Sequence, residues 1–184
     1  HTVSGSGTSG VIQLTNLEGL TLTVIDSSEA KTGKIANTGY SAPAIYINQN
    51  VGKVIWESGS AETNGACFNV QGKLEINGGT FTKKGVSSSY PLIEIGSYAT
   101  LILNDGIFNA QNAMNPIIKL KSSGQGRYIV INGGEYNVAK GGMLIQNVTV
   151  TEMASYDGYI QSGIFGGAFL NVNPDVSIPG NVSR

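Results

Sequence analysis

The stretch LEINGGTF, from Leu74 to Phe81, places apolar residues, an asparagine, two glycines and an aromatic residue in close succession. The same pattern returns as LILNDGIF at 101–108, as IVINGGEY at 129–136 and, more loosely, as GYIQSGIF at 158–165. Aligning the copies on the asparagine places Asn77, Asn104, Asn132 and Gln161 at spacings of 27, 28 and 29 residues. A period of this size indicates a stacked repeat.

A second set of short runs precedes this motif and keeps nearly the same period: AIYI at 44–47, CFNV at 67–70, LIEI at 92–95, IIKL at 117–120, MLIQ at 143–146 and FLNV at 169–172. Each is a short alternating run bounded by turn residues, which indicates a β-strand. A third strand is expected after each motif glycine. Three strands per period of about 26 residues predict one coil of a solenoid.

The predicted fold is all-β, a right-handed parallel β-helix with three strands per rung and about six or seven rungs. One domain is expected over 1–184, with irregular N-terminal rungs or a cap at 1–43, regular rungs at 44–172 and a C-terminal extension at 173–184. A β-sandwich also suits short strands separated by glycine, but it would not explain why side chains recur at a fixed period.

Equivalent side chains should stack at about 4.8 Å from rung to rung. We expect an inward aromatic stack of Phe81, Phe108, Tyr136 and Phe165, an aliphatic stack of Ile45, Phe68, Ile93, Ile118, Leu144 and Leu170, and a ladder of Asn77, Asn104 and Asn132. The glycine after the ladder position suits a corner that needs positive φ. Alignment with Ile76 sends Trp56 inward, and Cys67 is expected to be a buried thiol.

Composition argues against several classes of function. Charged residues make up only 12% of the chain and the net charge is −1, so nucleic acid is not an expected partner. No apolar stretch approaches the roughly 20 residues that span a bilayer, so no membrane insertion is expected. One cysteine and one histidine, at the first position, predict no metal site and no cofactor. The abundance of Ser, Thr, Asn and Gly favours an extracellular location.

The NGGTF corner and the strands before it resemble Gly-rich, pectate-lyase-like parallel β-helix repeats. These occur in surface and secreted proteins of Gram-positive gut bacteria and in phage tail fibre or tailspike proteins. The resemblance covers roughly 44–172 and implies the fold, whereas such coils serve as lyases, hydrolases, adhesins and stalks alike. The acidic clusters with Arg, Lys or His that the family's enzymes use have no counterpart in this chain.

Three acids are nevertheless candidates for catalysis on the outer face of the coil, as in a polysaccharide lyase or glycoside hydrolase. Glu94 should neighbour Lys119 one rung away, where a surface ion pair is the simpler interpretation. Asp105 takes the corner position that Gly78 and Gly133 hold, and it could reach solvent beside Glu135. Aspartate is also common in tight turns, so a structural role is the simpler interpretation of Asp105.

Loop tyrosines suggest the main functional hypothesis, because sugar rings stack their C–H faces on aromatic side chains. The candidates for ligand binding are Tyr90, Tyr98, Tyr128 and Tyr156. We therefore expect a non-catalytic extracellular module that binds a cell-surface or dietary glycan, or that acts as a rigid spacer. An outward apolar stripe of Ile102, Val130 and Tyr159 predicts either loop cover or a contact between subunits, as in a trimer.

Overall fold

The computed structural model describes residues 1–6, 10–16, 18–40, 42–50, 52–85, 90–112, 114–121, 127–146 and 163–172. All secondary-structure elements in these described residues are β-strands. In this part of the chain, no helix is long and apolar enough to cross a membrane.

The strands form three sheets. Sheet A contains β1 (Thr2–Gly5), β4 (Lys34–Asn37), β7 (Ser60–Thr63), β10 (Thr80–Lys83), β13 (Ile107–Ala110), β16 (Glu135–Gly142) and β19 (Ala168–Val172). Sheet B contains β2 (Ile12–Leu14), β5 (Ile45–Ile47), β8 (Phe68–Val70), β11 (Ile93–Ile95), β14 (Ile118–Leu120) and β17 (Ile145–Gln146). Sheet C contains β3 (Thr21–Val24), β6 (Lys53–Trp56), β9 (Lys73–Ile76), β12 (Thr100–Leu103), β15 (Tyr128–Ile131) and β18 (Gly163–Ile164).

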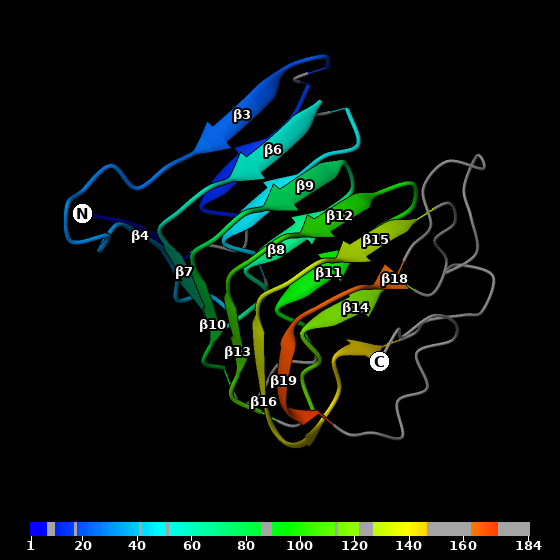
Figure 1. Cartoon of the computed structure of the whole chain (residues 1–184). Helices are drawn as coiled ribbons and strands as arrows, with labels where there is room; N and C mark the ends of the chain where they lie inside the picture. Colours follow the sequence, from blue (N-terminus) through cyan, green and yellow to red (C-terminus); the bar gives the residue numbers. More distant parts are fainter. Residues whose placement is uncertain are drawn as a thin grey trace.

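Every strand pairs in parallel with its equivalent one rung away, as in β9 with β12 and β12 with β15. The chain visits sheets A, B and C in turn, so β1 to β3 form the first rung and β19 begins a seventh. Figure 1 shows the strands of sheet C side by side from β3 to β18. The predicted right-handed parallel β-helix with three strands per rung is confirmed. The first rung pairs in register with the second, from β1 with β4 to β3 with β6.

The interior contains the predicted aromatic stack. Phe108 lies between Phe81 and Tyr136, with ring centroids 5.1 and 4.9 Å apart and interplanar angles of 16° and 5°. The next ring is Phe169, 5.1 Å from Tyr136, so the expected fourth member, Phe165, was wrong. Phe165 is 53% exposed instead.

The last copy of the motif is GIFGGAF at 163–169, four residues beyond the predicted alignment. Gly163 and Ile164 pair with Val130 and Ile131, and Gly167 takes the corner with a φ of 123°. The FLNV run consequently belongs to β19 in sheet A, so Leu170 is not in the aliphatic stack. The error arose because the connection from β17 to β18 is longer than the earlier ones, which moves the repeat out of its period.

The aliphatic stack is confirmed from Ile45 to Ile118 but shifts by one residue at the next rung. Ile118 pairs with Ile145, where Leu144 was expected. Both Ile145 and Leu144 are buried, at 2% and 1% exposure, but Ile145, not Leu144, takes the paired position of the stack. Lys119 pairs with Gln146 at the outward position. Two consecutive apolar residues fit either register, and this ambiguity explains the error.

Trp56 supplies an aromatic ring to the second rung, which has none at the position of the aromatic stack. Its side chain is 1% exposed and lies 5.3 Å from Phe81 and 5.6 Å from Phe68, measured between ring centroids. The position of the aromatic stack in β7 is Ala61, which pairs with Phe81. A small residue there leaves room for the indole, which enters from the neighbouring sheet. The inward orientation predicted for Trp56 is confirmed.

The asparagine ladder is also confirmed at the corner between sheets C and A. The Asn104 amide donates to Asn77 Oδ1, and the Asn132 amide donates to Asn104 Oδ1, both at 2.7 Å. Asn77 in turn donates to Glu57 Oε1 at 3.0 Å, so a carboxylate begins the ladder. The following Gly79 has a φ of 104°, and an added Cβ would lie 2.5 Å from the Gly59 carbonyl oxygen. Glycine is therefore required at this corner.

Candidate functional site

Glu94 lies on β11, on the outer face of sheet B. Its carboxylate accepts a hydrogen bond from Asn69 Nδ2 at 2.7 Å, and Oε2 is 3.6 Å from Lys121 Nζ. Lys119 is its neighbour across the strands, as expected, but the ion pair forms with Lys121. Residues two apart share one face of a strand, so both lysines are on the Glu94 side. The Glu94 carboxylate is thus held by an amide and a cation.

Asp105 and Glu135 belong to a different side of the coil. Asp105 is at the corner between β12 and β13, where its carboxylate accepts the N–H of Gly106 at 2.8 Å. Glu135 is the first residue of β16 in sheet A, and its Oε1 accepts from Asn137 Nδ2 at 2.7 Å. The structure therefore places the three candidate acids on two separate regions of the surface, with Glu94 on sheet B.

Tyr98 and Tyr128 lie on successive rungs of the corner between sheets B and C. Tyr98 is in the connection from β11 to β12, and Tyr128 is the first residue of β15 on the next rung. The N–H of Tyr128 donates to the carbonyl of Ala99 at 2.9 Å, which brings the two tyrosine positions onto neighbouring rungs of one corner. Burial raises the pKa of the Tyr128 phenol, so part of this ring is withdrawn from solvent.

Tyr98 combines exposure with an unusual backbone. Its side chain is 64% exposed, and its φ of 55° lies in the left-handed region. This region costs a residue with a Cβ roughly 1–2 kcal/mol, and asparagine and glycine are the residues that adopt it readily. The corner between the same two sheets in the first rung uses Asn16, with a φ of 54°. Neither packing nor backbone preference therefore accounts for a tyrosine at 98.

The other tyrosines do not join this pair. Tyr90 precedes β11 and lies in the connection from sheet A to sheet B, which is another corner of the coil. Tyr156 lies outside the described residues. The candidate site is thereby reduced to Tyr98 and Tyr128, which we call the tyrosine corner.

Arg127 is a buried residue that stabilises the backbone of the tyrosine corner. Its side chain is 3% exposed, Nε donates to the carbonyl of Gly96 at 3.0 Å, and the guanidinium also donates to the carbonyl of Lys121. The buried cation thus connects the two successive connections that cross this corner. Sequence reasoning missed it, because the direction of loop carbonyls is not encoded in a local pattern.

The outward apolar stripe is partly covered. Val130 points outward by register, opposite Ile102, yet it is only 8% exposed. Because Val130 is buried within a single chain, its burial agrees with cover by a loop, whereas a contact between subunits stays a prediction. Tyr159 lies outside the described residues.

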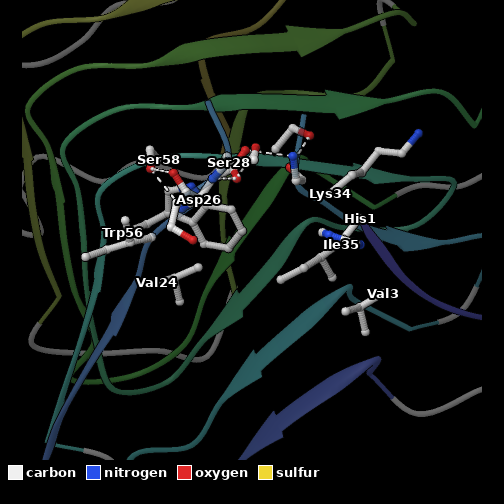
Figure 2. A pocket seen from close by; sticks show the side chains of 14 residues that line it. His1, Val3, Val24, Asp26, Ser28, Lys34, Ile35, Trp56 and Ser58 are labelled. Atoms are coloured by element: carbon white, nitrogen blue, oxygen red, sulfur yellow. Dashed lines mark hydrogen bonds between the residues drawn. The ribbon is translucent and has the colours of Figure 1, made fainter. Parts of the chain in front are cut away.

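A pocket of about 390 Å³ opens at the N-terminal end of the coil. Figure 2 shows Asp26, Ser28 and Ser58 gathered near Trp56, with Val24, Ile35 and Val3 below them in the view. The inward positions of the first two rungs are occupied here by Val3, Val24, Ile35 and Trp56, so the pocket is an open end of the hydrophobic core.

The polar groups of this pocket are engaged with one another. Asp26 accepts from the N–H and hydroxyl of Ser28 at 3.0 and 2.6 Å and from the N–H of Gly33 at 2.7 Å. The Ser28 hydroxyl, followed by these backbone donors, lowers the pKa of the Asp26 carboxyl. This network shapes the long connection from β3 to β4. Sequence reasoning gave no indication of it, because the short glycine corners of later rungs have no such loop.

Two buried nucleophilic groups lie inside the coil near β10. Lys83 is 1% exposed, and its Nζ donates to the carbonyls of Asn64 and Gly85 at 2.9 and 3.4 Å. Burial lowers the pKa of Lys83 to about 8. Cys67 is fully buried, as predicted, and burial raises the pKa of its thiol. Within the described residues, no group of three or more His, Cys, Asp and Glu side chains could hold a metal ion.

A shallow groove of about 360 Å³ follows the outer face of sheet A. Its polar side chains come from equivalent positions of three rungs, Thr82 on β10, Asn109 on β13 and Asn137 on β16.

Neither a protein-family model, a curated protein nor a solved structure gives a significant match to this chain. Function must therefore be argued from these sites themselves.

Proposed function

We propose that this chain is a non-catalytic β-helical module that binds a cell-surface or dietary glycan at the tyrosine corner. The proposal rests on the exposed Tyr98. Its left-handed backbone conformation costs strain energy that an asparagine at the same position would avoid. Strained residues that fold stability does not require are typical of binding sites. An exposed aromatic ring gives the C–H face of a sugar a surface on which to stack.

The location of the module belongs to the same proposal. We assign it to a surface or secreted protein of a bacterium or to a phage fibre, because the pectate-lyase-like repeats that it resembles occur in such proteins. A coil of in-register rungs with an aromatic stack is also rigid enough to hold a binding corner away from an attachment point. The spacer and binding roles are therefore compatible. A trimer or flanking domains would fit the same setting.

Glycan-array binding of the whole chain tests the proposal. Tyr98→Asn should abolish binding while the free energy of unfolding stays constant or rises by up to about 1 kcal/mol, because asparagine relieves the left-handed strain. Tyr128→Ala should also weaken binding. Tyr90→Ala is the matched control, since Tyr90 lies at another corner, and it should bind like the unmodified chain.

Binding that survives in both Tyr98→Asn and Tyr128→Ala would refute the tyrosine corner as the site. Equal loss in Tyr90→Ala would show that the effect is not local. Release of reducing ends from a polysaccharide by the unmodified chain would refute the non-catalytic role.

A further inference from the structure

The groove on sheet A has an outer face built of neutral side chains. It is lined by Thr82, Asn109, Ala110, Gln111, Asn137, Val138 and Ala139. None of these residues carries a charge at neutral pH. The nearby Lys84 is already 2.8 Å from the Glu62 carboxylate. The lining therefore offers hydrogen bonds rather than charge to a ligand.

A side-chain ladder fixes the polar groups of this groove. Asn109 Nδ2 donates to Thr82 Oγ1 at 3.4 Å, and Asn137 Nδ2 donates to Asn109 Oδ1 at 3.0 Å. The second hydrogen of the Asn137 amide goes to Glu135 Oε1 at 2.7 Å. These bonds hold the amides in one orientation before any ligand arrives, which lowers the entropy cost of binding.

The ladder leaves hydrogen-bonding capacity of both kinds within the described residues. The Thr82 hydroxyl hydrogen and one Asn109 amide hydrogen have no protein acceptor, and Asn137 Oδ1 has no protein donor. The residue that follows Asn137 in the next rung is Leu170, which cannot continue the ladder. Gln111, exposed at the end of β13, adds a further free amide. The groove thus offers two donors, at Thr82 and Asn109, followed by one acceptor at Asn137.

Apolar atoms lie beside these polar groups. Leu170 is 48% exposed one rung beyond Asn137, and Ala139 lines the groove on β16. A ligand that matches must carry hydroxyl groups that both donate and accept, C–H surfaces, and no charge. Carbohydrates combine these properties. The groove volume of about 360 Å³ is within the usual range of roughly 300–1,000 Å³ for small-molecule sites.

We propose that this groove binds a neutral oligosaccharide or polysaccharide segment lying along the coil axis. The ligand hydroxyls donate to Asn137 Oδ1 and accept from Thr82 and Asn109, over a length of about 10 Å set by two rung spacings. The ligand class is shared with the tyrosine corner, but the face is different. Each of the two sites can therefore fail independently of the other.

Amide NMR on the whole chain locates binding directly. The probes are neutral gluco-, manno-, xylo- and chitin-type tetrasaccharides, with tetragalacturonate as the charged comparison. At least one neutral probe should shift the side-chain amide signals of Asn109, Asn137 and Gln111. Asn137→Ala should raise the Kd of that probe by about tenfold, the effect of losing one well-placed polar contact.

Asn132→Ala is the matched control, because Asn132 ends the other ladder and likewise donates its amide to the asparagine one rung before it. It should leave the Kd within about twofold, well under the 1.4 kcal/mol that a tenfold change represents. The proposal is overturned if no neutral probe moves the groove signals at millimolar concentration, if Asn132→Ala weakens binding as much, or if tetragalacturonate binds more tightly. Shifts confined to the tyrosine corner and lost in Tyr98→Asn would overturn the groove while supporting the other site.

Discussion

The aromatic stack allows a quantitative test of how the rungs hold together. Phe108 is fully buried and stacks on Phe81 and on Tyr136, at centroid distances of 5.1 and 4.9 Å. Phe108→Leu keeps most of the apolar volume but removes both ring pairs, whereas Phe108→Ala also leaves a cavity. The two variants therefore separate stacking from volume.

The expected magnitudes follow from these contacts. Each stacked pair contributes about 0.5–1.5 kcal/mol beyond its buried area, so Phe108→Leu should cost about 1–3 kcal/mol. Phe108→Ala should cost about 3–5 kcal/mol, because the transfer free energy and the cavity are added. Ile118→Leu is the control in the same rung: Ile118 is also fully buried, and this swap should cost less than about 1.5 kcal/mol.

Equilibrium urea unfolding supplies the free energies, with Trp56 fluorescence and far-UV circular dichroism as the two probes. Trp56 contacts Phe81, the next ring along the stack from Phe108, so its emission reports on the same column. A cost for Phe108→Leu no larger than that of Ile118→Leu would refute a stabilising role for stacking. Separate transitions by the two probes would refute the assumption that the rungs unfold as one unit.

The ladder and the buried lysine give further predictions. Asn104→Ala removes two ladder bonds and should cost about 1–3 kcal/mol in urea unfolding, whereas Asn132→Ala removes one and should cost about half as much; equal costs would contradict the ladder. The pKa of Lys83 is lowered from 10.5 to about 8, so between these pH values the unfolded chain binds a proton that the folded chain has lost. Stability relative to Lys83→Met should therefore rise with pH across this window, measured as the difference between their urea unfolding free energies. The raised pKa values of Cys67 and Tyr136 act in the opposite direction; burial, the largest cause of both, is common to the two proteins and cancels in that difference. A difference independent of pH would show that Lys83 titrates normally.

The fold was predictable because a stacked coil repeats its side chains as well as its hydrophobic pattern. Asn77, Asn104 and Asn132 recur once per coil, at nearly constant spacing, and this stacking lets them hydrogen-bond from rung to rung. The period fails where a connection lengthens, and the last motif copy was therefore assigned four residues too early, at Phe165 in place of Phe169.

The candidate site was less predictable, although part of the signal was present. Tyr90 precedes the LIEI strand and Tyr98 follows it, which already places them at different corners of a three-sided coil. Thr82, Asn109 and Asn137 occupy one repeat position, so their ladder could have been inferred by the reasoning used for the other asparagines. Arg127 could not, because its role depends on which carbonyls the corner connections turn towards it.

Both proposed sites depend on the same property of the coil: its hydrogen bonds hold surface groups, as well as the core, in fixed positions. The groove amides are held by the ladder, and the tyrosine corner is held by Arg127 beneath it. A ligand then loses little affinity to ordering the protein, so modest contacts on an open face can suffice for binding. The same rigidity predicts different outcomes at the two sites. Breaking a ladder bond should weaken binding and stability together. Tyr98→Asn should weaken binding alone, because the Tyr98 side chain is mostly exposed and its backbone is strained. A variant that loses binding without losing stability therefore distinguishes a residue kept for a ligand from one kept for the fold.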